Sequence, residues 1–303
     1  MKRILTVAML LMIVSGFVLG EERRVIVPVN VSLFPFYGLG NAVTVVNNVQ
    51  INVGVGYADE LNGVALGVVS IIGDEVRGTQ VGVVNLAGGE VFGAQVGVVN
   101  GSLEGVRGPQ VGVVNLAAES SFQTGVVNAA AAASGVQIGV VNVAVTNTGA
   151  PIGLVSVVLE GGQTHAQSWI DETGLVNVGL IHGSRSTYNL YTAGTDVARE
   201  RVSLGLGLGA HFGEDRSWVN VEALAGSVSR TDALFESAAP LFRARVYTGY
   251  RIGPLSLIGG VSFNYLMDLG DSDVEVNPLH GYEFGFSTER HRFWPGAFVG
   301  VQL

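Results

Sequence analysis

The sequence predicts an all-β protein in which a tandem-repeat region is followed by an antiparallel β domain. Three observations support this fold class. Glycine accounts for 44 of the 303 residues, about twice its usual share. A Val-Gly-Val-Val-Asn motif recurs through the first half of the chain, and large apolar residues alternate with small ones in the second half. Because glycine disfavours helices and valine favours strands, both halves are expected to form β structure.

The first twenty residues have the layout of a secretory signal peptide. Lys2 and Arg3 provide a positive start, an apolar run follows, and the segment ends at Gly20. The apolar stretch at residues 4–19 is shorter than the roughly 20 residues that a membrane-spanning helix needs. We therefore expect residues 1–20 to be removed on export, and an uncleaved membrane anchor is the alternative.

The composition narrows the classes of partner and chemistry. The formal net charge is −9, Lys2 is the only lysine, and there is no cysteine. An acidic chain without a basic patch is repelled by nucleic acid, so no nucleic-acid partner is expected. Without cysteine, the chain has no disulfide framework and no thiolate that could bind a metal or act as a nucleophile.

Residues 64–160 form the tandem-repeat region. Glycines at positions 67, 82, 97, 112, 125, 139 and 153 mark units of 13 to 15 residues, a signature of repeat architectures. Two folds fit these units: the coils of a parallel β-solenoid, or the strands of one membrane β-barrel. Membrane strands need girdles of aromatic residues, and this region has only Phe92 and Phe122. The solenoid is therefore favoured.

In a solenoid, residues at the same phase of each unit stack on one another, and stacked amides hydrogen-bond along the stack. Glutamine precedes the repeat glycine and asparagine closes the motif in most copies. Strict alternation within residues 78–85 would place Gln80 and Asn85 on opposite faces of a strand. The predicted structural ladder consists of Gln80, Gln95, Gln110, Asn85, Asn100, Asn115, Asn128 and Asn142.

The segments that flank the repeats are also expected to be β-rich. Residues 21–63 should contain N-terminal strands, and residues 43–57 alternate in a way that makes them a candidate member of the C-terminal sheet. Residues 161–198 are expected to connect the repeats to an antiparallel, barrel-like domain at residues 199–303. Turn residues divide that domain into six candidate strands, at residues 202–209, 218–228, 242–250, 255–266, 282–287 and 297–303.

The repeats resemble a known family of exported surface-repeat proteins from spirochaetes and Bacteroidetes, built from units of the form G-x-Q-(I/L/V)-G-(L/V)-x-N. The matching units lie at residues 78–85, 93–100, 108–115 and 135–142, and the likeness extends over residues 25–212. The copy at residues 121–128 is shortened, so we expect a bulge or break in the ladder there. The resemblance implies a location in the cell envelope, and it implies no established activity of any kind.

No catalytic, cofactor-binding or metal site is expected. The five histidines lack metal-ligand spacing, and the acidic loop that contains Asp268, Asp271, Asp273 and Glu275 lacks the calcium-loop pattern. Arg243 and Arg245 share a strand face, which fits either a barrel lumen or a solvated face. We expect a non-enzymatic structural or surface protein of the bacterial outer envelope, at the outer membrane or cell surface or else in the periplasm. The alternatives are an adhesin-like module that binds a glycan or a protein, and an outer-membrane pore.

Overall fold

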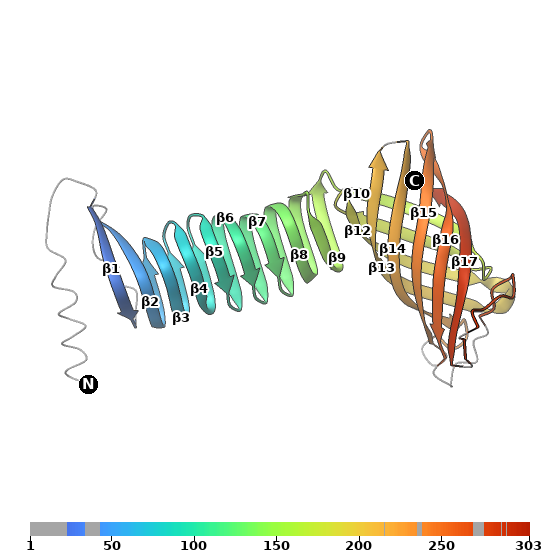
Figure 1. The fold of residues 1–303 in the computed structure, drawn as a ribbon, viewed down its shortest axis with the longest axis horizontal. Helices are drawn as coiled ribbons and strands as arrows, with labels where there is room; N and C mark the ends of the chain where they lie inside the picture. The colour runs from blue at the N-terminus through green and yellow to red at the C-terminus, as the bar shows by residue number, and fades with distance from the viewer. Residues whose placement is uncertain are drawn as a thin grey trace.

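The computed structural model describes residues 23–33, 43–214, 216–234, 238–268, 276–285, 287–288 and 290–303. Within these residues the chain contains no α-helix and is built from strands, which confirms the predicted all-β class. Two units follow each other along the chain, a nine-stranded parallel stack and a closed eight-stranded barrel (Figure 1). The predicted signal peptide at residues 1–20 and the acidic residues 271–275 lie outside the described residues.

The first unit is a β-solenoid in which every strand pairs in parallel with the next one. Equivalent repeat positions lie directly over one another: Val76 pairs with Val91, Gln80 with Gln95, and Asn85 with Asn100. This pairing rules out the alternative of antiparallel membrane strands for the repeats. The strands are β1 (Arg23–Ser32), β2 (Val43–Ala58), β3 (Glu60–Ile72), β4 (Val76–Ala87), β5 (Val91–Val96), β6 (Val99–Val111), β7 (Val114–Thr124), β8 (Val127–Asn147) and β9 (Ala150–Glu160).

Each coil turns a corner at its repeat glycine. A Cβ atom added at Gly97 would lie 2.4 Å from the carbonyl oxygen of Gly82 in the preceding coil, so a side chain cannot be accommodated. Because the chain changes direction here, Gln80 and Asn85 both point into the coil interior and both are fully buried. The expectation that they lie on opposite faces is wrong, since strict alternation holds only along an unbent strand.

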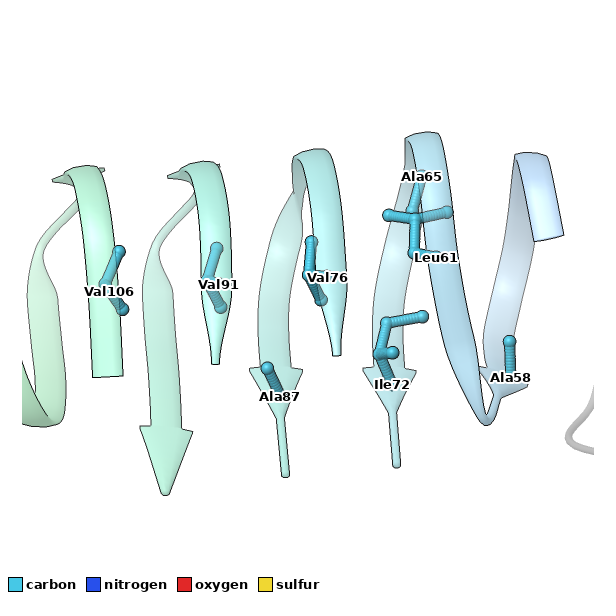
Figure 2. Close-up of a cluster of buried hydrophobic side chains, with 8 residues drawn as sticks. All are labelled: Ala58, Leu61, Ala65, Ile72, Val76, Ala87, Val91 and Val106. Atoms are coloured by element: carbon cyan, nitrogen blue, oxygen red, sulfur yellow. The ribbon is translucent and has the colours of Figure 1, made fainter. Parts of the chain in front are cut away.

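Small apolar side chains fill the part of the solenoid interior that the amides leave free. Leu61, Val76, Val91 and Val106 lie one above another in successive coils, as Figure 2 shows. Ile72 and Ala87 belong to the same buried cluster. The coils are therefore held together by apolar stacking as well as by backbone pairing.

One further expectation about the solenoid is corrected, because residues 43–57 lie in β2, which pairs with β1 and β3 and not with the C-terminal sheet. At the shortened copy the expected bulge is present as register shifts between β6 and β7, which absorb the missing residues, and the ladder is not broken. The pairing of Gln110 with Gln123 is kept.

The second unit is an antiparallel barrel closed by pairing of the first strand with the last. It begins earlier than expected, since residues 161–198 supply three of its strands and are not a connecting segment. The described residues of the candidate strand at 282–287, which are 282–285 and 287, are not in a strand, and the amide of Phe284 bonds to the carbonyl of Phe293. The barrel strands are β10 (Gln163–Asp171), β11 (Val176–Gly183), β12 (Thr187–Asp196), β13 (Arg201–Glu214), β14 (Ser217–Arg230), β15 (Ala239–Ile252), β16 (Leu255–Met267) and β17 (His291–Gln302).

The stagger of the barrel follows from its strand register. A path through paired residues that leaves β14 at Ser217 and goes once around the barrel returns to β14 at Ser227. For eight strands, this ten-residue offset corresponds to a strand tilt of about 40°. That tilt lies in the usual range for closed barrels.

The last coil of the solenoid packs against the outer wall of the barrel. The hydroxyl of Ser184, in the β11–β12 turn, donates to the carbonyl of Gly149 at 2.9 Å. Along β12, Asn189 donates to the carbonyl of Gly153, and the Tyr191 hydroxyl donates to the carbonyl of Leu154 at 2.6 Å. The solenoid leaves the barrel sideways from this contact (Figure 1).

Candidate functional site

Two amide ladders run through the solenoid interior. In the glutamine ladder, Nε2 of Gln95 donates to Oε1 of Gln80, and Nε2 of Gln110 donates to Oε1 of Gln95, each at 2.8 Å. In the asparagine ladder, Nδ2 of Asn85 donates to Oδ1 of Asn100, and Nδ2 of Asn100 donates to Oδ1 of Asn115, each at 2.9 Å. Glutamine amides thus donate towards the N-terminal coils and asparagine amides towards the C-terminal coils. The two ladders have opposite polarity, so their dipoles oppose each other.

Each ladder amide also satisfies the backbone. The second hydrogen of Gln95 Nε2 reaches the carbonyl of Gly101 at 3.1 Å, and that of Asn100 Nδ2 reaches the carbonyl of Val111 at 3.0 Å. The Val111 carbonyl directly precedes the corner at Gly112, and the Gly101 carbonyl directly follows Asn100. A buried polar group without a partner is costly, so the ladders make a narrow polar interior stable.

The structure brings all eight predicted ladder residues together and adds members that the sequence argument missed. The asparagine ladder continues from Asn115 through Asn128 to Asn142. The glutamine ladder continues through Gln123 and Gln137. Gln123 stands two residues before a repeat glycine, as Gln80 does, and this spacing was the available signal.

Inside the barrel, a buried network surrounds Glu222. The Tyr188 and Tyr247 hydroxyls donate to its Oε1 at 2.7 and 2.9 Å, and Arg245 Nε donates to Oε2 at 2.8 Å. The Arg245 guanidinium also lies over the Trp169 ring, 4.5 Å from its centroid. Since a barrel of eight strands is only wide enough to be filled by side chains, this network occupies the lumen.

A second polar cluster lies closer than the Glu222 network to the barrel end that carries the β10–β11 turn. Arg243 pairs with Asp171 at 3.0 Å. Glu172 accepts hydrogen bonds from Trp294 Nε1 at 2.8 Å and from Asn264 Nδ2 at 2.9 Å. Arg243 and Arg245 therefore both point into the lumen, and the solvated-face alternative is wrong.

The outer wall of the barrel is apolar. Leu204, Leu206 and Leu208 face outwards and remain 58%, 49% and 40% exposed, whereas the alternating glycines of β13 face the lumen. Other strands present the same kind of surface, for example Val178, Val246, Leu257, Val261 and Val299. This arrangement inverts the usual distribution of polar and apolar side chains.

Metal-binding side chains do not gather in the part of the chain that the structure describes. Among those residues, no group of three or more His, Asp or Glu side chains could hold a metal ion. In the same described ranges, no helix is long and apolar enough to cross a membrane. Comparison with family models, with curated proteins and with solved structures returned no match to this chain.

Proposed function

We propose that the barrel anchors the protein in a bacterial outer membrane and that the solenoid is a rigid, non-enzymatic structural arm attached to it. The observation that carries the proposal is the inverted polarity of the barrel. Six charged residues of the barrel strands lie inside: Asp171, Asp196, Arg201, Glu222, Arg243 and Arg245. The other charged strand residues with described side chains, Arg230, Arg251 and Arg292, lie near strand ends.

The dimensions of the apolar wall fit a membrane. On β13, the outward positions from Val202 to Phe212 are apolar throughout. Ten steps of about 3.3 Å along a strand tilted by about 40° span roughly 25 Å, which matches the apolar band of outer-membrane barrels. A water-exposed barrel would gain nothing from an apolar outer wall of this height.

An anchor is favoured over a pore. Buried side chains fill the lumen at the level of Glu222, where Gln167 and Asn220 also donate to the Tyr247 hydroxyl at 2.8 Å. An open aqueous channel needs many more strands. The pore alternative is therefore not supported by the geometry of the barrel.

The connections suggest the orientation. At one end, only two or three residues separate β11 from β12, β13 from β14 and β15 from β16, and both barrel termini lie there. At the other end, the connections include residues 231–238 and 268–290. Outer-membrane barrels have short periplasmic turns and longer extracellular loops. We infer that the solenoid, which joins the short-turn end, lies on the periplasmic side.

The experiment is fractionation of cells that carry the full chain with Leu206→Cys, the only cysteine in that variant. We expect an outer-membrane protein whose band shifts on boiling, and a thiol at position 206 that a water-soluble maleimide labels only after denaturation. A barrel in water would expose position 206 and react in the native state. Recovery in the soluble fraction, with native labelling and no shift on boiling, would refute the proposal.

A further inference from the structure

The solenoid has two edges of opposite character. At one edge, the side chains before and after each corner glycine form two columns, for example Val81, Val96 and Val111 in one and Val83, Val98 and Val113 in the other. In the seven coils from Leu66 to Leu154, Thr124 is the only polar residue in these columns. We call this edge the apolar ridge. Its thirteen apolar residues are each 37% to 49% exposed.

The opposite edge, where one coil passes to the next, carries charge. Asp74 and Glu75 lie in one turn, and Glu90 lies in the next one. Arg77 pairs with Glu75, whose hydrogen bond and charge raise the pKa of Arg77 further above its ordinary value. Arg107 pairs with Glu90. Phe92 and Leu103 are also exposed at this edge, so it is mixed in polarity, and it differs from the apolar ridge in carrying charge.

The apolar ridge is too large to be an ordinary exposed patch. With coils about 4.8 Å apart, it extends over roughly 30 Å. At about 70 Å² exposed per residue it totals on the order of 900 Å², above the roughly 300–600 Å² of the largest patch on a typical soluble monomer. A surface of this size needs a cover.

The contact with the barrel shows which way the apolar ridge points. The charged edge of the last coil meets the end of the barrel, where Ser184 bonds to Gly149. The ridge edge meets β12 farther along the wall, where Tyr191 bonds to Leu154. Tyr191 pairs across strands with Leu180 and Leu206, which belong to the outward apolar wall. The apolar ridge therefore runs into the apolar wall and points in the same direction along the barrel.

The backbone of the apolar ridge is suited to a low-dielectric surrounding. Even the backbone N–H groups at the corners form hydrogen bonds between coils. The N–H of Gly97 donates to the carbonyl of Val111, and the N–H of Val113 donates to the carbonyl of Val98, each at 2.9 Å. Backbone groups that face lipid must be satisfied within the protein. The corners meet that condition.

We propose that the apolar ridge inserts into the periplasmic leaflet of the outer membrane, with its valines in contact with the lipid acyl chains and the charged edge in water. This inference rests on the proposed membrane anchor. The occupant is lipid because the ridge is continuous with the wall that the anchor exposes to lipid. The solenoid is then an arm that lies along the membrane surface beside the barrel.

The test uses the full chain in nanodiscs of phosphatidylethanolamine and phosphatidylglycerol. Single cysteines replace Val113 on the apolar ridge, Glu104 on the opposite edge of the same coil, and Leu206 on the barrel wall, and each carries a fluorophore. We expect lipids brominated in their acyl chains to quench the labels at 113 and 206 and to leave the label at 104 unquenched. Aqueous iodide should quench only the label at 104.

The outcomes separate the two proposals. Lipid quenching at 206 with iodide quenching at 113 would overturn the lipid-facing ridge and leave the anchor intact. Absence of lipid quenching at 206 would refute the anchor itself. A label at 113 shielded from both quenchers, in nanodiscs that hold two chains, would overturn the lipid contact and show that a second copy covers the ridge. If Val113→Cys fails to fold, Val98→Cys occupies the equivalent position one coil away.

Discussion

Replacement of Asn100 by leucine removes one rung from the asparagine ladder and keeps the same branched skeleton of side-chain heavy atoms. Asn100 accepts a hydrogen bond from Asn85 and donates to Asn115 and to the carbonyl of Val111, all at 2.9 to 3.0 Å. Leucine leaves these three buried groups without that partner. At about 1–1.5 kcal/mol for each of the three groups, the free energy of unfolding of the solenoid should fall by roughly 3–4.5 kcal/mol.

The assay can observe the solenoid separately from the barrel. All three tryptophans, Trp169, Trp218 and Trp294, lie in the barrel, so tryptophan fluorescence reports barrel unfolding while circular dichroism reports both units. In a urea titration of the full chain, Asn100→Leu should shift the solenoid transition and leave the fluorescence transition in place. The exposed Asn62 in the same stack provides the control. If Asn62→Leu lowers stability as much as Asn100→Leu, the ladder argument is wrong.

Three further substitutions test other parts of the structure. Gly97→Ala places a Cβ atom against a carbonyl of the preceding coil and should lower the urea midpoint of the solenoid far more than Gly101→Ala, which meets only a side-chain carbon. Glu222→Gln leaves the Arg245 charge unpaired in the lumen and should lower the stability of the barrel by about 3–5 kcal/mol. The measurement is the urea midpoint of the transition followed by tryptophan fluorescence, and an unchanged midpoint would contradict a packed charge network. Leu206→Arg should cost roughly 2–4 kcal/mol of barrel stability in lipid if the residue lies near the midplane, and folding yields into vesicles equal to the wild type would argue against insertion.

The sequence by itself determined the repeat, and it favoured a stacked solenoid with amide ladders over membrane strands. Few folds are compatible with a period of 13 to 15 residues that keeps glycine, valine and an amide at fixed phase. Stacking of the units is favoured because it lets identical amide side chains form hydrogen bonds with one another. The alternation of β13 likewise predicted which of its residues share a face. Leu204, Leu206 and Leu208 do share the outer one.

Local patterns were not sufficient where the chain changes direction. Gln80 and Asn85 are five residues apart and would point in opposite directions along a straight strand. They share the interior because the corner at Gly82 intervenes, and only the packing of that glycine against the preceding coil shows this. The same packing turns the valines outwards and creates the apolar ridge.

Tertiary structure alone decided how the barrel closes and how the solenoid meets it. The strands at residues 163–196 carry lumen residues such as Gln167, Asn177 and Tyr188, and these polar and aromatic side chains obscure the simple alternation of a half-buried strand. Closure by pairing of β10 with β17 joins segments more than a hundred residues apart, and no local signal encodes it. The contact between Leu154 and Tyr191, which aims the apolar ridge along the barrel wall, is equally non-local and depends on the relative position of two completed units.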